Sequence, residues 1–216
     1  MAMGFVIVDP QKDFMPGGNL AVTDGNQIVQ PIIRAMKHFH NDMIFVTKDS
    51  HPKEHRSFAS NNEGTNVLDV IEVNGIQQVM WPDHCVDDTD GQEIAQELQD
   101  ALPPGVVVVH KGLDVGYDSY SGVKDAGGKR TGLVELMTAK GITSAMLVYV
   151  AGLATDYCVK ATALDLAAEG YKVRVIIDGC RGVAEGTTEQ ALAEMDDAGI
   201  EFVKAEAMGV PVRPLE

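Results

Sequence analysis

The chain has 216 residues, of which 45% are hydrophobic and 23% are charged, the balance of a soluble globular protein. Its 32 acidic and 17 basic side chains give a formal net charge of -15, which argues against nucleic acid and anionic membranes as partners. No apolar run approaches the roughly 20 residues of a membrane-spanning helix. The three cysteines are widely spaced and include no CxxC pair, so we expect a cytoplasmic protein without a disulfide framework.

Short apolar runs alternate with helical patterns along the chain. Runs rich in Val and Ile predict six β-strands, at residues 5–9, 43–49, 106–112, 145–152, 172–178 and 200–205. Helical spacing of apolar residues predicts helices at 26–41, 92–101, 131–140, 157–169 and 187–198. Because apolar strands that alternate with helices are typical of a buried parallel sheet, we predict a single α/β domain over residues 1–216. Its six-stranded, mainly parallel, doubly wound sheet would lie between helices in a three-layer α/β/α arrangement.

Two long irregular segments, 50–90 and 111–130, interrupt this alternation. Loops of this length in a compact domain are commonly functional. In doubly wound folds, ligands bind beyond the carboxyl ends of the strands, so chemistry-bearing residues at that edge predict a site. The candidates that follow strands at that edge are Asp9, Asp49, Lys111 and the turn 152–158.

Cys158 begins the helical pattern that follows the fourth predicted strand. A thiol becomes a nucleophile as its thiolate, and the free N–H groups at a helix N-terminus favour an anion. We expect Thr155 or Asp156 to cap this helix, and the N–H groups of the turn could form an oxyanion hole. The alternative is a small buried cysteine that packs at a crowded turn.

Asp9 and Lys111 are the candidate partners of this thiol. Asp9 closes a buried strand, where a carboxylate is costly without a role or a partner, and it is the candidate general base. Lys111 is the candidate cation, whose charge would hold Asp9 and Cys158 in their ionised forms. A purely structural ion pair between Asp9 and Lys111 is the alternative interpretation.

The stretch "KDSHPKEH" places Asp49, His51 and His55 at spacings of two and four residues. Side chains two residues apart at a strand end point the same way, and His84 in "WPDHC" offers a fourth ligand. One carboxylate with three imidazoles suits Zn²⁺ or Fe²⁺, with positions left open for water or substrate. Solvated loop histidines are the alternative.

Aromatic side chains accompany these candidates. Phe14, Trp81, Tyr117 and Tyr120 could together stack a flat aromatic substrate. Each of them, taken singly, is more often a core or loop packing residue.

Five motifs stand in the order and spacing of the nicotinamidase/pyrazinamidase family of isochorismatase-like cysteine hydrolases, which the chain therefore resembles. They are "VDPQKDF", "TKDSHPKEHRSF", "WPDHCV", "HKGLDVGYDSYSG" and "GLATDYCVKATAL". The resemblance extends from about Phe5 to Phe202. It implies the sheet order 3-2-1-4-5-6, counted along the predicted strands, with a switch point between strands one and four, where Asp9 and Cys158 emerge.

The resemblance also implies roles for individual residues. The implied catalytic triad is Asp9, Lys111 and Cys158. The implied oxyanion hole consists of the N–H groups of Ala154 and Cys158, with a cis peptide between Leu153 and Ala154. The implied ligands of a divalent metal, Zn²⁺ or Fe²⁺ with Mn²⁺ as a further candidate, are Asp49, His51, His55 and His84. The implied walls of the pyridine pocket are Phe14, Trp81, Tyr120 and Leu153.

The implied activity is hydrolysis of nicotinamide to nicotinate and ammonia in NAD salvage, through a thioester on Cys158, with pyrazinamide as a second aromatic amide substrate. An amidase of the N-carbamoylsarcosine type would share the triad but needs no metal. A metal-hydroxide hydrolase and a non-catalytic metal-binding protein are further alternatives. Ser50 replaces a tryptophan that is usual in the family, and Asp88 stands where glycine is common, so pocket detail stays open. The sequence also leaves homo-oligomerisation open.

Overall fold

The structure, a computed structural model, describes residues 3–214, so the ends of the predicted domain, 1–2 and 215–216, lie outside it. The main sheet has six parallel strands in the order β5-β2-β1-β6-β7-β8. Their bounds are β1 Met3–Val8, β2 Ile44–Asp49, β5 Val107–Lys111, β6 Leu147–Leu153, β7 Lys172–Arg181 and β8 Glu201–Val203. Counted along the six predicted strands, this order is 3-2-1-4-5-6, so both the strands and their arrangement are confirmed.

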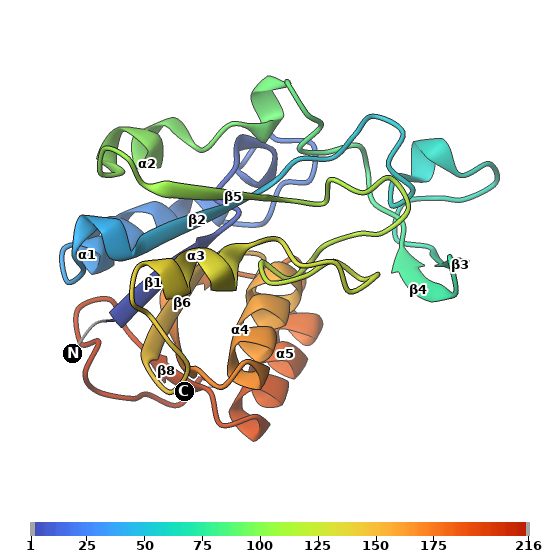
Figure 1. Cartoon of the computed structure of the whole chain (residues 1–216). Helices are drawn as coiled ribbons and strands as arrows, with labels where there is room; N and C mark the ends of the chain where they lie inside the picture. The colour runs from blue at the N-terminus through green and yellow to red at the C-terminus, as the bar shows by residue number, and fades with distance from the viewer. Residues whose placement is uncertain (1–2, 215–216) are drawn as a thin grey trace.

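Five α-helices accompany the sheet within residues 3–214, and each predicted helix corresponds to one of them. Their bounds are α1 Val29–Met36, α2 Gln96–Ala101, α3 Leu133–Ala139, α4 Lys160–Ala168 and α5 Glu185–Asp197. Helices α1 and α2 lie together on one side of the sheet, and α4 lies beside α5 on the other (Figure 1). Several helices are shorter than predicted because tighter or wider turns, such as the 3₁₀ turn Gly25–Ile28 before α1, replace their first residues.

The central strands explain why the sheet forms. In β1, the side chains from Phe5 to Val8 are fully buried, and β6 is buried from Val148 to Leu153. Strands that are covered on both faces have continuous apolar sequences, and this is the pattern from which the strands were predicted. No helix among residues 3–214 is both long and apolar enough to cross a membrane.

The irregular segment 50–90 contains a β-hairpin that the sequence analysis did not predict. Strands β3 (Val70–Val73) and β4 (Ile76–Val79) pair in an antiparallel two-stranded sheet, set apart from the main sheet (Figure 1). Asn74 and Gly75 form the turn between them, both at positive φ. Asn-Gly between short β-type runs is the strongest local signal for such a hairpin, so the sequence did contain the information.

Candidate active site

The side chain of Lys111 is the centre of a buried cluster at the carboxyl ends of β1, β2 and β5. Its Nζ lies 2.9 Å from Asp9 Oδ2 and 2.6 Å from Asp49 Oδ1. It also donates to Ser119 O at 2.6 Å and to Cys158 Sγ at 3.5 Å. The structure thus brings Asp9, Lys111 and Cys158 together, and it adds Asp49, whose contact with Lys111 the sequence analysis missed.

Parallel pairing places these groups side by side. Asp49 and Lys111 are paired residues of β2 and β5, so their side chains leave the sheet at the same level. Asp9 follows β1 directly and adopts a positive φ of 45°. Its Oδ1 accepts a hydrogen bond from Thr47 Oγ1 at 2.6 Å, which orients the carboxylate from the neighbouring strand.

Burial and charge set the protonation of the cluster. Burial raises the pKa of Asp9 to about 6, although the Lys111 ammonium opposes the shift. Burial also disfavours the charged form of Lys111, but Asp49 and Asp9 outweigh it and raise the pKa of Lys111 well above its usual range. Lys111 is therefore a fixed cation, and Asp9 is the carboxylate that can exchange a proton near neutral pH.

Cys158 lies in a π-helical turn, Thr155–Val159, that joins β6 to α4. The expected cis peptide between Leu153 and Ala154 is present directly before this turn. Burial raises the pKa of the Cys158 thiol well above its usual range, and although Lys111 opposes this, Asp9 and Asp49 reinforce it. Burial first, and the two facing carboxylates after it, therefore favour the protonated thiol against the effect that we expected of Lys111.

The expected cap on this turn is also absent, because neither Thr155 nor Asp156 bonds its N–H groups through a side chain. The Asp156 carboxylate instead accepts hydrogen bonds from the backbone N–H groups of Val183 and Ala184, at the start of α5. Asp156 thus bonds N–H groups next to α5 and none in its own turn, because α5 begins beside that turn.

The four candidate metal ligands are all buried, which excludes the interpretation of solvated loop histidines. Asp49, His51 and His84 offer ligand atoms within 4.8 Å of one another. Ligand atoms of His55, His51 and Asp118 form a second group, again within 4.8 Å of one another. The two groups share His51, and Asp118 is a carboxylate that the sequence analysis did not single out.

The hydrogen bonds of the imidazoles fit metal binding. His51 Nδ1 donates to Gly112 O at 3.1 Å, and His84 Nδ1 donates to Pro82 O at 2.8 Å, which leaves each Nε2 free as a ligand. The Nε2 of His55 is buried without a hydrogen-bond partner, an arrangement that a metal ion would satisfy. Burial lowers the pKa of His51 and of His84 to about 4, so both are neutral, as ligation requires.

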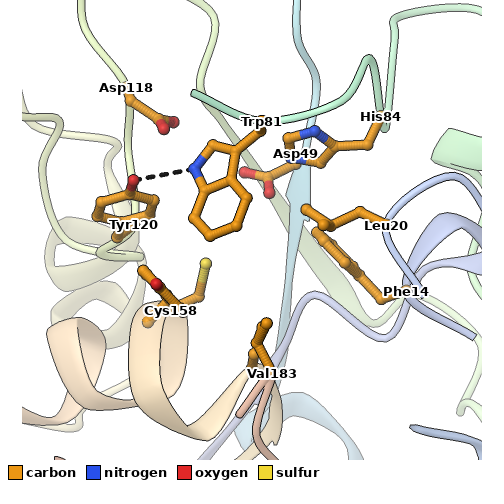
Figure 2. A pocket seen from close by; sticks show the side chains of 11 residues that line it. Phe14, Leu20, Asp49, Trp81, His84, Asp118, Tyr120, Cys158 and Val183 are labelled. Carbon is orange, nitrogen blue, oxygen red and sulfur yellow. Dashed lines mark hydrogen bonds between the residues drawn. The ribbon is translucent and has the colours of Figure 1, made fainter. Parts of the chain in front are cut away.

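A pocket opens onto Cys158 and the candidate ligands Asp49 and His84 (Figure 2). Phe14, Trp81 and Tyr120 line it, as the sequence analysis expected. The remaining lining residues are Leu20, Asp118, Ala154, Tyr157 and Val183.

One expected wall residue is missing from the pocket lining. The Leu153 side chain is fully buried and reaches toward Gly25 in the core. The Leu153 side chain therefore does not line the pocket, because Leu153 ends a strand whose inward face packs against the Gly25–Ile28 turn. Leu20 and Val183 take wall positions instead, and no polar pattern marks such apolar residues in a sequence.

Hydrogen bonds fix the aromatic walls. Trp81 Nε1 donates to Tyr120 Oη at 3.0 Å (Figure 2). Gln78, on β4, donates to Tyr120 Oη at 3.3 Å and to Asp118 Oδ2 at 3.1 Å. The unpredicted hairpin thus supports one wall of the pocket.

The two departures from the family motifs lie outside the pocket lining. Ser50 is buried, its Oγ accepts a hydrogen bond from Gln92 Nε2 at 2.8 Å, and it lies 2.6 Å from His110 Nδ1. Asp88 is exposed at a φ of 60°, in the left-handed region that favours glycine. Neither substitution changes a residue that lines the pocket.

Comparison with known proteins agrees with this geometry. The family model described as "Isochorismatase domain" matches residues 3–207. The chain belongs to the isochorismatase family. Among its members, the nicotinamidase of Acinetobacter baylyi is 38% identical over 202 residues, covering 93% of this chain and 91% of that protein. A solved Acinetobacter baumanii nicotinamidase/pyrazinamidase superposes with a TM-score of 0.88 at 37% identity, covering 95% of this chain and 97% of that one. Within the isochorismatase family, the chain therefore belongs to the nicotinamidases.

Two further solved members of the family carry ligands. The pyrazinamidase of Pyrococcus horikoshii, in complex with zinc, is 32% identical with a TM-score of 0.74, covering 94% of this chain and 99% of that one. The yeast nicotinamidase bound to the inhibitor nicotinaldehyde is 28% identical with a TM-score of 0.86, with the same coverage of 94% and 99%. A divalent metal and a small aromatic ligand are thus found in relatives of the same fold.

Proposed function

We propose that this chain is a nicotinamidase, which hydrolyses nicotinamide to nicotinate and ammonia in NAD salvage. The observation that carries the proposal is a buried thiol, Cys158, within 3.5 Å of Lys111 Nζ, in a pocket that also presents aromatic walls and imidazoles. An ion pair with only a structural role would not require a pocket at the thiol. Relatives named nicotinamidase, at 38% and 39% identity over most of the chain, support the same activity.

Asp9 is the proposed general base. Its raised pKa, about 6, matches a group that must take a proton from the Cys158 thiol and return it at neutral pH. Lys111 stays charged throughout and stabilises the negative charge as it passes between Asp9 and Cys158. Because burial favours the protonated thiol, Asp9 has to accept its proton for the thiolate nucleophile to form.

The chemical steps follow from these positions. Cys158 Sγ attacks the carboxamide carbon, and its proton passes to Asp9. The N–H groups of Ala154 and Cys158 are the proposed donors to the oxyanion. Asp9 then protonates the leaving ammonia, which leaves a thioester on Cys158. Asp9 next accepts a proton from a water molecule that attacks the thioester, and nicotinate is released as the thiol is restored.

The proposed substrate pocket holds the pyridine ring flat. Phe14, Trp81 and Tyr120 supply aromatic faces and edges, and Tyr157 packs against Trp81 with ring centroids 4.9 Å apart. Pyrazinamide has the same flat outline and is the proposed second substrate. An amidase for non-aromatic N-carbamoyl substrates would have no use for this aromatic lining or for buried imidazoles.

A divalent metal is proposed at Asp49, His51, His55 and His84. A carboxylate with three imidazoles suits Zn²⁺ or Fe²⁺, with Mn²⁺ as a further candidate. The metal would supply a Lewis acid beside the pocket, able to bind a ring nitrogen and so fix the position of the ring. We also propose a cytoplasmic location, since Cys85, Cys158 and Cys180 are free thiols.

The test is ammonia release from nicotinamide by purified, metal-replete protein, with and without prior alkylation of its thiols. We expect release that alkylation abolishes. Release that survives alkylation would favour a metal-hydroxide hydrolase with a passive cysteine. Release from N-carbamoylsarcosine but not from nicotinamide would favour the other amidase class, and release from neither would leave a metal-binding protein.

A further inference from the structure

Asp156 has no assigned role, yet its carboxylate is among the most completely bonded side chains near the nucleophile. Its Oδ1 accepts the N–H of Val183 at 2.9 Å, and its Oδ2 accepts the N–H of Ala184 at 3.2 Å. The Thr187 hydroxyl also donates to Oδ2. All three donors lie 27 to 31 residues later in the chain, at the start of α5.

The position of Asp156 makes this arrangement relevant to catalysis. It lies in the π-helical turn Thr155–Val159, two residues before Cys158 and two after Ala154. These are the residues whose N–H groups are the proposed oxyanion donors. π-helical turns are rare and occur frequently at functional sites, so a contact that fixes this turn also fixes the positions of its N–H groups.

The start of α5 is a suitable anchor. Val183 and Ala184 directly precede Glu185, the first residue of α5, and the dipole at a helix N-terminus favours a negative charge there. A buried carboxylate is costly without such donors, and Asp156 is only 4% exposed. The three hydrogen bonds give the carboxylate its donors and give the two N–H groups an acceptor. They join the nucleophile turn, Thr155–Val159, to the start of α5. The same bonds hold Val183, which lines the pocket with Cys158 (Figure 2).

We propose that Asp156 is a positioning residue that clamps the nucleophile turn to the start of α5 and so aims the N–H groups of Ala154 and Cys158 at the developing oxyanion. The inference rests on the proposed function. Hydrogen-bond donors that are fixed before the reaction stabilise the transition state most, and small misplacements lower the rate steeply. The clamp therefore acts on kcat, whereas the aromatic walls act on substrate binding.

The kinetic test compares variants that remove hydrogen bonds between Asp156 and its donors. Asp156→Asn keeps the shape of the side chain but presents an N–H₂ group to donors, so we expect kcat to fall about 10- to 100-fold. KM should change less than about threefold, because most of the pocket lining is untouched. Thr187→Val removes one donor and should lower kcat by a smaller factor, and Thr187→Ser, which keeps the hydroxyl, should restore it.

Thr188→Val is the matched control. Thr188 lies next to Thr187, and its hydroxyl donates to Ala184 O at 2.6 Å rather than to Asp156. We expect this variant to turn over substrate like the wild type. Circular dichroism and size-exclusion chromatography of each variant exclude unfolded protein from every rate.

A second readout separates positioning from stability. The Cys158 thiol can add across the carbonyl of nicotinaldehyde: the Sγ–C bond forms, the C=O π bond breaks, the thiol proton passes to Asp9 and the oxygen takes the negative charge. This tetrahedral adduct needs the oxyanion donors, whereas planar nicotinate needs only the pocket. In Asp156→Asn, the inhibition constant of nicotinaldehyde should rise in parallel with the loss in kcat, and that of nicotinate should stay unchanged.

The outcomes distinguish the inference from the proposed function. Wild-type turnover of nicotinamide together with unchanged kcat in both Asp156→Asn and Thr187→Val would overturn the inference alone. Equal weakening of nicotinaldehyde and nicotinate would also overturn it, since it would indicate a general loss of structure. Wild-type protein that releases no ammonia from nicotinamide would contradict the proposed function, and the inference with it.

Discussion

The two halves of the candidate site are built differently. Asp9 and Lys111 stand at the ends of parallel strands, where backbone pairing sets their relative positions, and Cys158 lies in the turn that joins β6 to α4. The half that carries His51, His55 and His84 belongs to the irregular segment 50–90, whose regular structure is a small hairpin and the 3₁₀ turn Ala59–Asn61. The first half takes its geometry from the sheet, and the second depends on individual side chains.

The second half is held by isolated β-bridges, His51 with Val86 and Phe58 with Trp81, and by polar side chains. Asn61 Nδ2 donates to His55 O at 3.0 Å, and Asn62 Nδ2 donates to Phe58 O at 2.7 Å. Asp13 Oδ2 accepts the N–H of Cys85 at 2.7 Å and so ties the "WPDHC" stretch to the loop after β1. A rigid sheet can hold costly buried charges, whereas a loop held by single bonds is the part that mutations or ligands can reshape.

The largest effect is expected on the sheet side, from removal of the nucleophile. Cys158→Ala should lower kcat by at least about 10⁴-fold, because no other group can form the thioester. The variant should keep its metal, since Cys158 lies outside the proposed ligand set. Ammonia release and metal content measure the two halves separately. Substantial residual turnover would contradict covalent catalysis.

Lys111→Met tests how strongly the sheet side depends on its buried cation. Removal of Lys111 leaves Asp9 and Asp49 as unpaired buried carboxylates, so the free energy of unfolding should fall by about 3–5 kcal/mol. Urea denaturation measures it. Lys48→Met, which breaks a pair with the exposed Glu93, is the control and should cost about 1 kcal/mol or less. Equal losses in the two variants would contradict the central role of Lys111.

On the loop side, His84→Ala should weaken metal binding by at least about 100-fold while the protein stays folded. The sheet does not depend on this side chain, so thermal unfolding should move little. Competition with a chromogenic chelator measures the affinity. Metal-free His84→Ala protein with full activity would exclude a role of the metal in substrate binding.

The pH dependence of kcat/KM distinguishes Asp9, on the sheet side, from the imidazoles on the loop side. Asp9, with its pKa raised to about 6, must be ionised to accept the thiol proton, so kcat/KM should fall about tenfold per pH unit below about 6. His51 and His84, with pKa values near 4, stay neutral in that window. Rates should be measured between about pH 8 and pH 5, with metal content checked at each end. A flat profile would exclude Asp9 as the base.

The smallest effect is expected from the support of the pocket wall. Gln78→Leu removes hydrogen bonds to Asp118 and Tyr120, worth about 1 kcal/mol, so KM should rise about fivefold with little change in kcat. Gln77→Leu, on the exposed neighbour in β4, is the control. An unchanged KM for Gln78→Leu would show that the hairpin does not support the pocket.

The sequence by itself determined the architecture and the main chemistry-bearing residues. Val- and Ile-rich runs are local signals, and they predicted all six strands of the sheet because buried parallel strands are apolar on both faces. Asp9, Asp49 and Lys111 could be identified because ionisable residues at the ends of such runs are unusual. The strand order and the cis peptide were implied by the resemblance to the family.

Contacts between distant segments were decided only by the tertiary structure. Nothing local indicates that Asp49 also pairs with Lys111, or that Asp156 bonds the start of α5 rather than its own turn. Likewise, Leu20 and Val183 line the pocket while Leu153 packs inward. Apolar and capping residues look the same in a sequence whichever surface they meet, because their partners depend on the path of the chain and not on neighbouring residues.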